Sequence, residues 1–526
     1  MKPTLLYFLF IVALLSDVVL LGQKNVIWQK VITVDSLNKV NKAALTSDGG
    51  FIIGGYTQHQ FQSYTSNYNT DIYVAKLNSY GDIQWSKSIG DENRNLLKSI
   101  YETSDKGFVI GAWDKGQDTI ILDNGRVHIR DVYRIIKLDY SGDIQADKTL
   151  SGTKDDFIFS VKETQDKGYI VGGHSNSISG KDMTRSVKGG KDWWILKLDQ
   201  NFKIKWQHTF GGGRSEYFAD VLQISSGDFL YTGYSDSSGG STDPYPSEND
   251  QNDYLIVKGN KTKSLKWVKF YGGNRDEKLS SVIETKDGGF LLGGISNSVI
   301  GENKTAKHLG GYDIWLVKID AEGNLIWDRT LGGMADDAIG SLQELPNGDI
   351  IVGGSVEVDI KPSEDGQLKG HKDYYIVKLD NNGIEKWYKT LGKEKNEFLV
   401  NAIELESNEL FLAGTSYSVD PERINGQYNT DIWLLKLDIS DENKFPDSIS
   451  FKVKNHYFQI LSSKSKISSI EFYDNEGGLL RNIKIQNKRR CNLKFDTISK
   501  NTKYIRIISA NKSGIWDLYN IRSSTN

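Results

Sequence analysis

Seven aspartates recur at nearly constant spacing, and each opens an apolar run such as DIYVAKL (71–77) or DIWLVKI (313–319). They are Asp71, Asp131, Asp192, Asp253, Asp313, Asp373 and Asp431. Seven carboxylates gathered on one face could bind cations. A short acceptor at the start of a strand can instead accept hydrogen bonds from the N–H groups of an adjacent loop. Because every repeat carries this Asp, we expect the structural role.

A lysine follows the Asp by five positions in six of these runs: Lys76, Lys197, Lys258, Lys318, Lys378 and Lys436. Five is odd in a period of two, so this Lys points to the opposite sheet face and cannot bind its own Asp. We expect it to be solvated or to contact the neighbouring repeat. In the second run, Lys137 lies six positions after Asp131. Either a bulge absorbs one residue there, or Val132 takes the Asp position.

A second set of acidic residues lies between the repeats: Asp155-Asp156, Glu216, Asp276-Glu277, Asp336-Asp337 and Glu397. Metal binding or paired-carboxylate glycoside chemistry is conceivable for them. No loop has the alternating Asp/Asn spacing of a calcium loop, so calcium is possible without a specific motif. We expect these acids to support turns, and we predict no cofactor.

Residues for nucleophilic or metal catalysis form no recognisable motif. The chain has no G-x-S-x-G sequence and a single cysteine, Cys491, which excludes an intramolecular disulfide. Its seven histidines lack H-E-x-x-H spacing. His174, His308 and His371 come from different repeats and could converge on one face. We assign no catalytic or metal-binding residue and expect the protein not to be an enzyme.

The elements that carry these residues repeat with a second, independent marker. Six tryptophans and one alanine recur with the same period as the aspartates: Trp28, Trp85, Ala146, Trp206, Trp267, Trp327 and Trp387. Between them, hairpin signals such as TKDGGFLLGG (285–294) join two strands through Asp-Gly or Asn-Gly turns. Each unit therefore predicts four antiparallel strands, which is the blade of a β-propeller.

The order of the markers predicts seven blades and their closure. The chain begins with a fourth-strand segment, NVIWQKVI (25–32), and the seventh blade lacks its own fourth strand. The N-terminal strand would complete that blade and leave no open sheet edge. The alternative is an open β-solenoid, but a solenoid does not require that the strand missing from the last repeat be present at the start of the chain.

The long segments between the second and third strands differ in sequence from blade to blade. They cover roughly 57–70, 113–130, 175–191, 235–252, 296–312, 356–372 and 416–430. Variable loops on a rigid scaffold commonly carry recognition. The first holds His59, Phe61, Tyr64 and Tyr68, and the fourth holds Tyr245; these aromatic residues could stack on sugars or anchor a protein partner. Plain spacer loops are the alternative.

The two ends of the chain differ from the repeats. Residues 1–22, with Lys2 before the apolar run LLYFLFIVALL (5–15), have the layout of a secretory signal peptide, and Asp17 argues against a spanning helix. We expect the propeller over 23–439, a linker over 440–448 and a small β-sandwich over 449–526. The formal net charge of −3 shows no basic signature, so nucleic acid is a poor ligand candidate.

Two segments resemble known families. ISSIEFYDNEGGLLRNIKIQ (467–486), with KYIRIISANKSGIWDLYNI (503–521), resembles the C-terminal sorting domain of the type IX secretion system of Bacteroidetes; Tyr473, Asp474, Gly477 and Leu479 match its hairpin motif. Gly478 stands where that family has Lys or Arg, and the usual Pro-Asn-Pro start is reduced to Phe445-Pro446-Asp447. The repeats over about 25–438 resemble propeller repeats of secreted proteins from the same bacteria, a family without a shared chemistry. The resemblance implies export, with the secretion machinery as a partner.

Together these features predict an all-β protein, a seven-bladed propeller plus a small C-terminal β-sandwich. We expect a secreted or outer-cell-surface location, no transmembrane span in the mature chain, and non-catalytic recognition of an extracellular glycan or protein. The alternatives are a polysaccharide lyase or hydrolase with its site at the mouth of the central channel, and a purely structural surface protein.

Overall fold

The computed structural model describes the chain from residue 25 to residue 517. Within that range it leaves out 35–36, 59–69, 91–93, 122–126, 237–250, 262–263, 302, 363–367, 393–394, 406–407, 419–428, 441–448, 455–456, 463–466, 474–478, 489, 495–503 and 510–511. The predicted signal peptide and most of the predicted linker lie outside the described residues. Among the described residues, no helix has the length and apolar composition needed to cross a bilayer.

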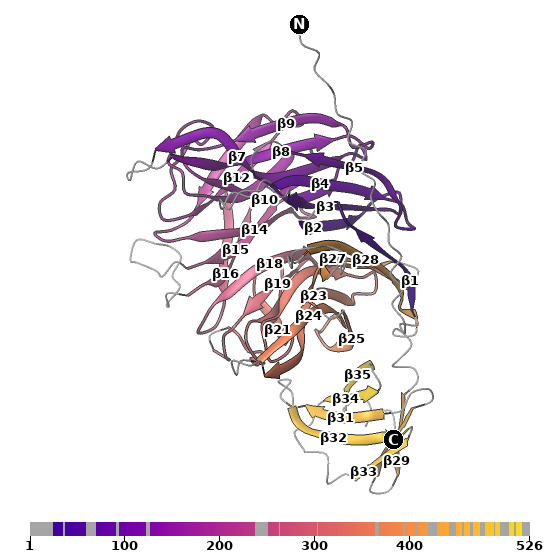
Figure 1. Cartoon of the computed structure of the whole chain (residues 1–526). Coiled ribbons are helices and arrows are strands. Elements are labelled where there is room, and N and C mark those ends of the chain that lie inside the picture. Colours follow the sequence, from indigo (N-terminus) through magenta and orange to yellow (C-terminus); the bar gives the residue numbers. More distant parts are fainter. Residues whose placement is uncertain are drawn as a thin grey trace.

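The fold is a seven-bladed β-propeller, as predicted (Figure 1). Blade 1 contains β2 (Leu37–Leu45), β3 (Phe51–Gln58), β4 (Thr70–Leu77) and β5 (Ile83–Ile89). Blade 2 contains β6 (Asn95–Glu102), β7 (Phe108–Ile121), β8 (Val127–Leu138) and β9 (Ile144–Leu150). Blade 3 contains β10 (Asp156–Glu163), β11 (Tyr169–Ser175), β12 (Asp192–Leu198) and β13 (Ile204–Phe210). Blade 4 contains β14 (Glu216–Gln223), β15 (Phe229–Ser235), β16 (Asp253–Gly259) and β17 (Leu265–Tyr271). Blade 5 contains β18 (Glu277–Glu284), β19 (Phe290–Ser296), β20 (Asp313–Ile319) and β21 (Leu325–Leu331). Blade 6 contains β22 (Ala338–Glu344), β23 (Ile350–Pro362), β24 (Leu368–Leu379) and β25 (Glu385–Leu391).

Blade 7 closes the ring with both ends of the propeller sequence. It contains β26 (Glu397–Leu405), β27 (Glu409–Ser418) and β28 (Asn429–Asp438), and β1 (Val26–Ile32) pairs antiparallel with β28, placing Trp28 opposite Lys436. Each innermost strand contacts the innermost strand of the next blade, and β26 contacts β2 again. The predicted closure is therefore confirmed, and the open solenoid is excluded.

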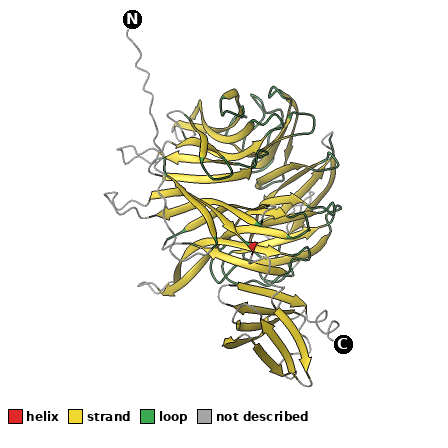
Figure 2. Ribbon diagram, turned by 90° about the vertical axis from the view of Figure 1, so that its right-hand side faces the viewer, coloured by secondary structure: helices red, strands yellow, loops and turns green. Residues whose placement is uncertain are grey.

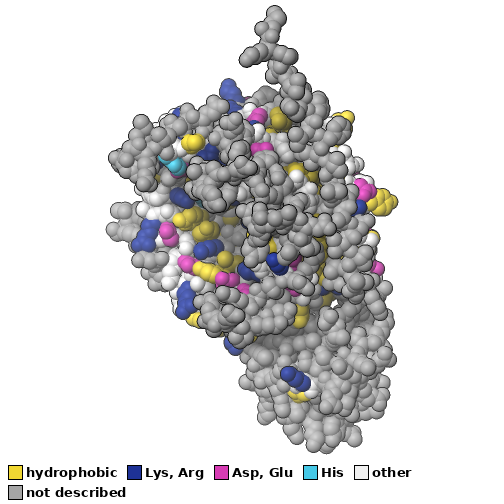
Figure 3. Space-filling view, viewed as in Figure 1, with side chains coloured by type: hydrophobic (Ala, Val, Ile, Leu, Met, Phe, Trp, Pro, Cys, Tyr) yellow, Lys and Arg dark blue, Asp and Glu magenta, His cyan; other side chains and the backbone are white. Residues whose placement is uncertain are grey.

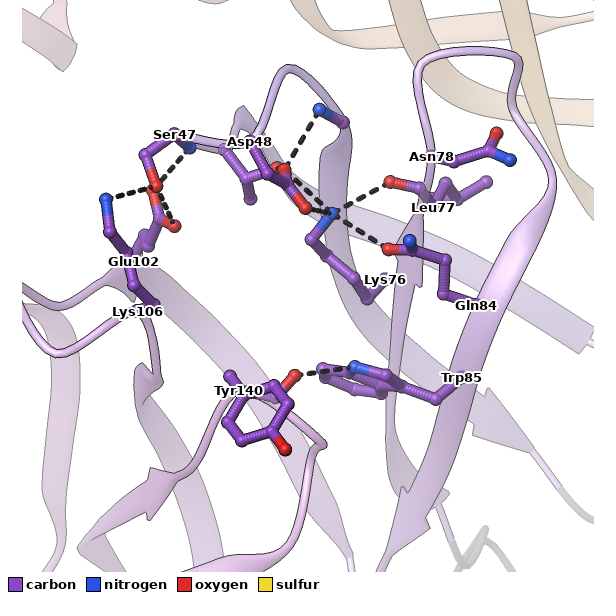
Figure 4. A network of polar contacts seen from close by, with 12 residues as sticks. Ser47, Asp48, Lys76, Leu77, Asn78, Gln84, Trp85, Glu102, Lys106 and Tyr140 are labelled. Atoms are coloured by element: carbon purple, nitrogen blue, oxygen red, sulfur yellow. Dashed lines mark hydrogen bonds and ion pairs between the residues drawn. The ribbon is translucent and has the colours of Figure 1, made fainter.

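The recurring tryptophan of the fourth strand joins one blade to the next. Trp85 of blade 1 packs edge-on against Phe108 of blade 2, with ring centroids 5.8 Å apart. Its indole N–H donates to the carbonyl of Tyr140, in a turn of blade 2, at 2.9 Å (Figure 4). Trp28 packs in the same way against Phe51 across the closing junction, at 6.4 Å. The recurrence of Trp along the sequence thus marks contacts between blades.

The recurring lysine of the third strand lies inside its own blade, which corrects the expected solvated or inter-blade position. Lys76 is 6% exposed, and its ammonium group binds the Asp48 carboxylate at 2.9 Å and the Leu77 carbonyl at 3.0 Å (Figure 4). Asp48 belongs to the hairpin turn between the first two strands. A buried ammonium needs such partners because its desolvation is costly.

The same pairing recurs around most of the ring. Lys137 binds Asp105, Lys197 binds Asp166, Lys318 binds Asp287 and Lys436 binds Glu409. In blade 6, Lys378 binds Glu404 of blade 7 at 2.8 Å. Lys258 of blade 4 donates to Ala321 of blade 5 at 3.0 Å. Inter-blade contact, one of the two expected roles, is thus found at Lys378 and Lys258.

Blade 2 distinguishes the two alternatives for its third strand. Asp114 pairs with Val132 and Lys115 with Asp131, and the register is continuous from there to Phe108 opposite Leu138. No bulge absorbs a residue in that stretch. Val132 therefore takes the position that Asp holds in the other blades, and Asp131 lies one step outside it.

Among the described segments between second and third strands, those of blades 2 and 6 are alike, and those of blades 3 and 5 share a turn. In blades 2 and 6 they are largely long hairpins, because β7 and β8, and likewise β23 and β24, extend beyond the sheet. In blades 3 and 5 the connecting segments share one β-bridge, since Gly180 bridges Met183 as Gly301 bridges Lys304. The sequence patterns SNSISG (175–180) and SNSVIG (296–301) carry that likeness.

Every innermost strand has a β-bulge at the same place. The register shifts after Val40, Leu97, Ile158, Phe218, Leu279, Ile339 and Leu399. The residue that resumes the pairing is polar in all seven blades: Lys42, Ser99, Ser160, Asp220, Ser281, Ser341 and Asn401. A bulge bends its strand and redirects side chains.

Several of these polar side chains connect neighbouring blades around the ring axis. Ser341 accepts a hydrogen bond from the N–H of Ala402 at 2.9 Å. Ser99 accepts one from Val161 at 3.2 Å. The inner wall of the ring is therefore held by side-chain to backbone bonds as well as by apolar packing.

The chain beyond the propeller forms two small sheets. β29 (Ile449–Lys454), β30 (Tyr457–Ser462) and β33 (Arg490–Lys494) make one; β32 (Leu479–Lys488), β31 (Ile467–Tyr473), β34 (Tyr504–Ser509) and β35 (Lys512–Asp517) make the other. These strands form a separate group below the ring (Figure 2). The strand content matches the prediction, and the sandwich arrangement stays a prediction.

Candidate functional site

The aromatic residues predicted to bind a ligand lie outside the described residues. They are His59, Phe61, Tyr64, Tyr68 and Tyr245. Their role stays a prediction, and the site must be sought among the described side chains. On the face that Figure 3 shows, described acidic, basic and hydrophobic side chains are intermixed.

The seven recurring aspartates are engaged locally. Asp192 accepts a hydrogen bond from the N–H of Lys188 at 2.8 Å, and Asp313 accepts one from Leu309 at 2.8 Å, both in the loop before the strand. Asp431 accepts from the Thr33 hydroxyl at 2.7 Å, across the closing junction. Asp131, out of register, pairs with Arg94 at 3.0 Å. These contacts are what a structural acceptor would make.

The glycine after the fourth strand packs directly on this aspartate. A Cβ on Gly90, Gly272 or Gly392 would lie 2.0, 1.7 or 1.9 Å from a carboxylate oxygen of Asp71, Asp253 or Asp373. The close approach explains why the strand ends in Gly and holds each carboxylate against its own blade.

The acids that open the innermost strands support the turns before them. Glu277 accepts from the Gly273 N–H at 2.8 Å and from the Ser296 hydroxyl at 2.6 Å. Asp156 makes the same pair of contacts, with Gly152 at 2.7 Å and Ser175 at 2.5 Å. Burial raises the pKa of Asp156 to about 6 and that of Asp337 to about 7, with the Asp313 charge adding to the latter. Among the described residues, no group of three His, Cys, Asp or Glu side chains is placed to hold a metal ion.

The acids one position earlier link neighbouring blades. Asp155 accepts from the N–H of Asp131 at 3.0 Å, Asp276 from Asn252 at 3.1 Å, and Asp336 from Tyr312 at 2.8 Å. Each bond runs from the end of one blade's connecting segment to the start of the next blade. The acidic pairs thus divide between turn support and blade contact.

A cluster of aromatic rings lies across blades 2, 3 and 4, at the end of the ring that carries the long connecting segments. Trp113 of β7 packs against Phe157 and Phe159 of β10 at 5.1 and 5.3 Å. His174 of β11 lies 5.4 Å from Phe157 and 5.5 Å from Tyr217 of β14. Tyr234 of β15 stacks on Tyr217 at 4.9 Å. We call Trp113, Phe157, Phe159, His174, Tyr217 and Tyr234 the aromatic platform.

Two lysines lie over the rings of the aromatic platform. The Lys98 ammonium is 3.8 Å from the centroid of Trp113. The Lys191 ammonium is 5.2 Å from Phe157 and 5.2 Å from Tyr217. Contacts of this length are cation–π interactions, which place positive charge beside an apolar surface.

The platform is partly open to solvent. Its members are half-buried except His174, which is 4% exposed. Sequence reasoning missed it because its contacts join residues of different blades, which lie far apart along the chain. A signal existed in DF (156–157), EY (216–217) and EF (397–398), where an aromatic residue follows the buried acid.

The titratable groups of the platform are poorly suited to acid–base chemistry near neutral pH. Burial, with the charges of Lys191 and Lys98, lowers the pKa of His174 to about 3, and its Nδ1 accepts the Phe218 N–H at 3.3 Å. Burial raises the pKa of Tyr234 to about 12. General acid–base catalysis works best with a pKa near the operating pH.

The three candidate histidines do not share one site in the described structure. His174 lies in the platform, whereas His308 binds Asp313 in its own blade at 2.9 Å. The His371 side chain lies outside the described residues; its backbone pairs with Val358.

Comparisons with known proteins add little. No family model matches the chain, and no curated protein matches it. Among solved structures, a candidate gluconolactonase is 9% identical with a TM-score of 0.30, over 65% of this chain and 88% of the other. Prolyl oligopeptidase B from Galerina marginata is 10% identical with a TM-score of 0.38, over 82% and 56%. A glucose dehydrogenase is 8% identical with a TM-score of 0.31, over 60% and 95%. Similarity at this level says nothing about activity.

Proposed function

We propose that the protein is a secreted or cell-surface propeller that binds an extracellular glycan, without catalysis, on the aromatic platform of blades 2 to 4. The observation that supports this proposal is the set of half-buried rings flanked by Lys98 and Lys191. Sugar rings stack on aromatic faces through their C–H surfaces, and tyrosine and tryptophan supply large rigid contact areas at low entropic cost. The depressed pKa of His174 favours binding over acid–base catalysis.

The proposed location rests on the sequence. Residues 1–22 have the layout of a signal peptide, and 467–486 resembles a type IX sorting hairpin. We propose that the C-terminal region serves export. Deleting residues 449–526 in the native bacterium should retain the propeller inside the cell. Equal export of the truncated chain would overturn this part of the proposal.

A glycan-array screen of the mature chain, with and without calcium, tests the binding function. We expect a hit that Tyr217→Ala weakens by about tenfold or more, as loss of one stacking ring would do. Tyr217→Phe, which keeps the ring, should retain binding. Tyr140→Ala is the matched control, because Tyr140 is a 73% exposed tyrosine in a turn at the other end of the blade.

The competing function is a polysaccharide lyase, favoured by the contact between His174 and Tyr217. Incubating any glycan hit with the protein and following the ultraviolet absorbance of unsaturated sugar products separates the two. Product formation that His174→Ala abolishes would replace the binding function with catalysis. Absence of a hit on the array, or a hit that Tyr217→Ala leaves unchanged, would remove the platform as the site.

A further inference from the structure

Two positions of blades 3 to 7 lie at the end of the ring that carries the connecting segments. The first is the residue before the recurring Asp of the third strand, and the second is the residue after the buried acid that opens the innermost strand. The backbone brings them together across the blade junctions: the Glu216 N–H donates to the Lys191 carbonyl, and the Asp337 N–H to the Tyr312 carbonyl, each at 2.6 Å. We call these two positions the rim positions.

Lysines and aromatic residues at the rim positions contact one another. The Lys191 ammonium of blade 3 lies 5.2 Å from the ring centroid of Phe157 in its own blade and 5.2 Å from that of Tyr217 in blade 4. Two further contacts of this kind follow around the ring: Lys278 with Tyr312 in blade 5, at 5.1 Å, and Lys372 of blade 6 with Phe398 of blade 7, at 5.8 Å. Since equivalent positions of a propeller are arranged around one axis, these contacts continue the aromatic platform along the rim.

The acids beside the rim lysines already have other partners. Asp276 accepts hydrogen bonds from the Asn252 side chain at 2.9 Å and from the Tyr312 hydroxyl at 3.2 Å. Glu216 is buried and accepts from the Gly212 N–H at 2.9 Å. Among the described residues, no carboxylate lies within ion-pair distance of the three rim lysines, which are Lys191, Lys278 and Lys372. Their ammonium groups are therefore free to pair with an anion from solution.

Solvent reaches both members of each rim contact. The three lysines and the rings beneath them are all half-buried. A cation–π contact holds an ammonium group beside the ring, so less side-chain freedom is lost when a ligand binds there. A neutral sugar that covered the ring would desolvate the ammonium group without compensation. A sugar with an anionic substituent would stack on the ring and also pair with the charge.

We propose that the glycan bound on the aromatic platform is acidic, a chain whose sugar rings carry carboxylate or sulfate groups. The inference rests on the proposed function, because it names the class of glycan for the same site. One sugar ring stacks on Tyr217 and its anionic group pairs with Lys191. Further sugars extend along the rim toward Lys278 and Lys372. Charge-assisted hydrogen bonds of this kind are stronger than neutral ones, and several lysines in a row favour a chain over a single sugar.

The glycan array gives the first result. Its hits should be acidic glycans, and a neutral hit that Tyr217→Ala weakens would overturn the inference while the proposed function stands. Isothermal titration calorimetry of the mature chain at pH 7 gives the second, with a β-1,4-linked mannuronate hexasaccharide, mannohexaose and chemically sulfated mannohexaose. These probes share the sugar ring and the linkage. We expect at least one acidic probe to bind about tenfold or more tightly than mannohexaose, and the one that does distinguishes carboxylate from sulfate recognition.

Two readouts on the parent protein need no variant. Binding of the acidic probe should weaken as sodium chloride rises from about 0.05 M to about 0.5 M, because salt screens the lysines. The hexasaccharide should bind more tightly than the corresponding monosaccharide. Equal binding of acidic and neutral probes would overturn the inference. Absence of binding by every probe on the array and in the calorimeter would remove the proposed function as well.

Substitutions of one rim lysine locate the anionic group. Lys191→Met should weaken binding of the acidic hexasaccharide by about tenfold, whereas Lys191→Arg keeps the charge and should retain most of it. Lys87→Met is the matched control, since it removes the same charge from an outer strand, where Lys87 pairs with Asp143 at 2.8 Å. Equal binding by the parent, Lys191→Met and Lys87→Met proteins would overturn the assignment of the anion to the rim.

Discussion

The hydroxyl of Tyr254 donates a 3.0 Å hydrogen bond to the backbone carbonyl of Trp315, across the boundary between blades 4 and 5. Both side chains are fully buried. Tyr133 and Trp194 make the same contact between blades 2 and 3, and Tyr374 and Trp433 make it between blades 6 and 7, each at 3.1 Å. The contact thus occurs at every second junction over six blades.

Removing one of these hydroxyls should weaken the ring. Tyr254→Phe is expected to lower the free energy of unfolding by about 1 kcal/mol, because one buried hydrogen bond is lost with little change in packing. Urea denaturation followed by tryptophan fluorescence measures it. Tyr56→Phe, at a half-buried position on blade 1, is the comparison; an equal loss there would contradict the assigned role.

The glycine beneath the tyrosine should be harder to replace. A Cβ on Gly294 would lie 2.5 Å from the Tyr254 hydroxyl and 2.1 Å from the Lys278 carbonyl. We expect Gly294→Ala to cost about 1–3 kcal/mol by overpacking. Gly288→Ala is unsuitable as a control because its φ is +80°, whereas Gly213, with open space around its Cβ position, provides one. Similar losses at Gly294 and Gly213 would refute the close approach.

The buried lysine of the third strand should contribute more than an exposed one. Lys318 is 5% exposed and binds the Thr285 hydroxyl at 2.9 Å and the Asp287 carboxylate at 2.8 Å. Lys318→Met is expected to destabilise the protein by about 1–3 kcal/mol, the range for hydrogen bonds to charged groups. Lys87→Met removes an exposed pair and should cost less than about 1 kcal/mol. Thermal denaturation of the two variants measures both losses, and an equal loss of stability in Lys318→Met and Lys87→Met would contradict the prediction.

Asp337 should make stability depend on pH. Burial raises the pKa of Asp337 in the folded protein to about 7, whereas its unfolded pKa is near 4. The contribution of Asp337 to the free energy of unfolding is therefore fully present below about pH 4 and is lost as the pH rises through 7. Asp337→Asn should therefore gain stability relative to the parent protein between pH 5 and pH 8. Urea midpoints of both proteins at the two pH values test this. A constant difference would show that Asp337 ionises normally.

The closing strand should be required for a single cooperative transition. Deleting residues 25–34 removes the partner of β28 and exposes a strand edge that can pair with another chain. We expect a lower midpoint of thermal unfolding and concentration-dependent association by light scattering. Adding the 25–34 peptide in trans should partly reverse both effects. A monomeric variant with unchanged unfolding would contradict the closure.

The blade count, the closure and the strand order were predictable because Asp and Trp markers repeat independently with the same period. The partner of the recurring lysine was not, although its sheet face was deduced correctly. Asp287 lies well before Lys318 in the sequence, and only the folded hairpin turn brings the two together. The inner-strand bulges were also missed, although each leaves a signal: the apolar residues on its two sides, such as Leu279 and Val282, are three positions apart instead of two. One ring of the platform, Phe159, is the bulged residue of β10.

The alternation of Tyr–Trp contacts has a consequence of parity. Junctions with and without the contact can alternate all the way around a closed ring only if the number of blades is even. Here the junctions of blade 1 with blade 7 and with blade 2 both lack the contact, because Ile432 and Ile72 stand where blades 2, 4 and 6 have the donor tyrosine. Blade 1 is thus the mismatch that an odd ring imposes, and it is also the blade beside the strand that closes the circle.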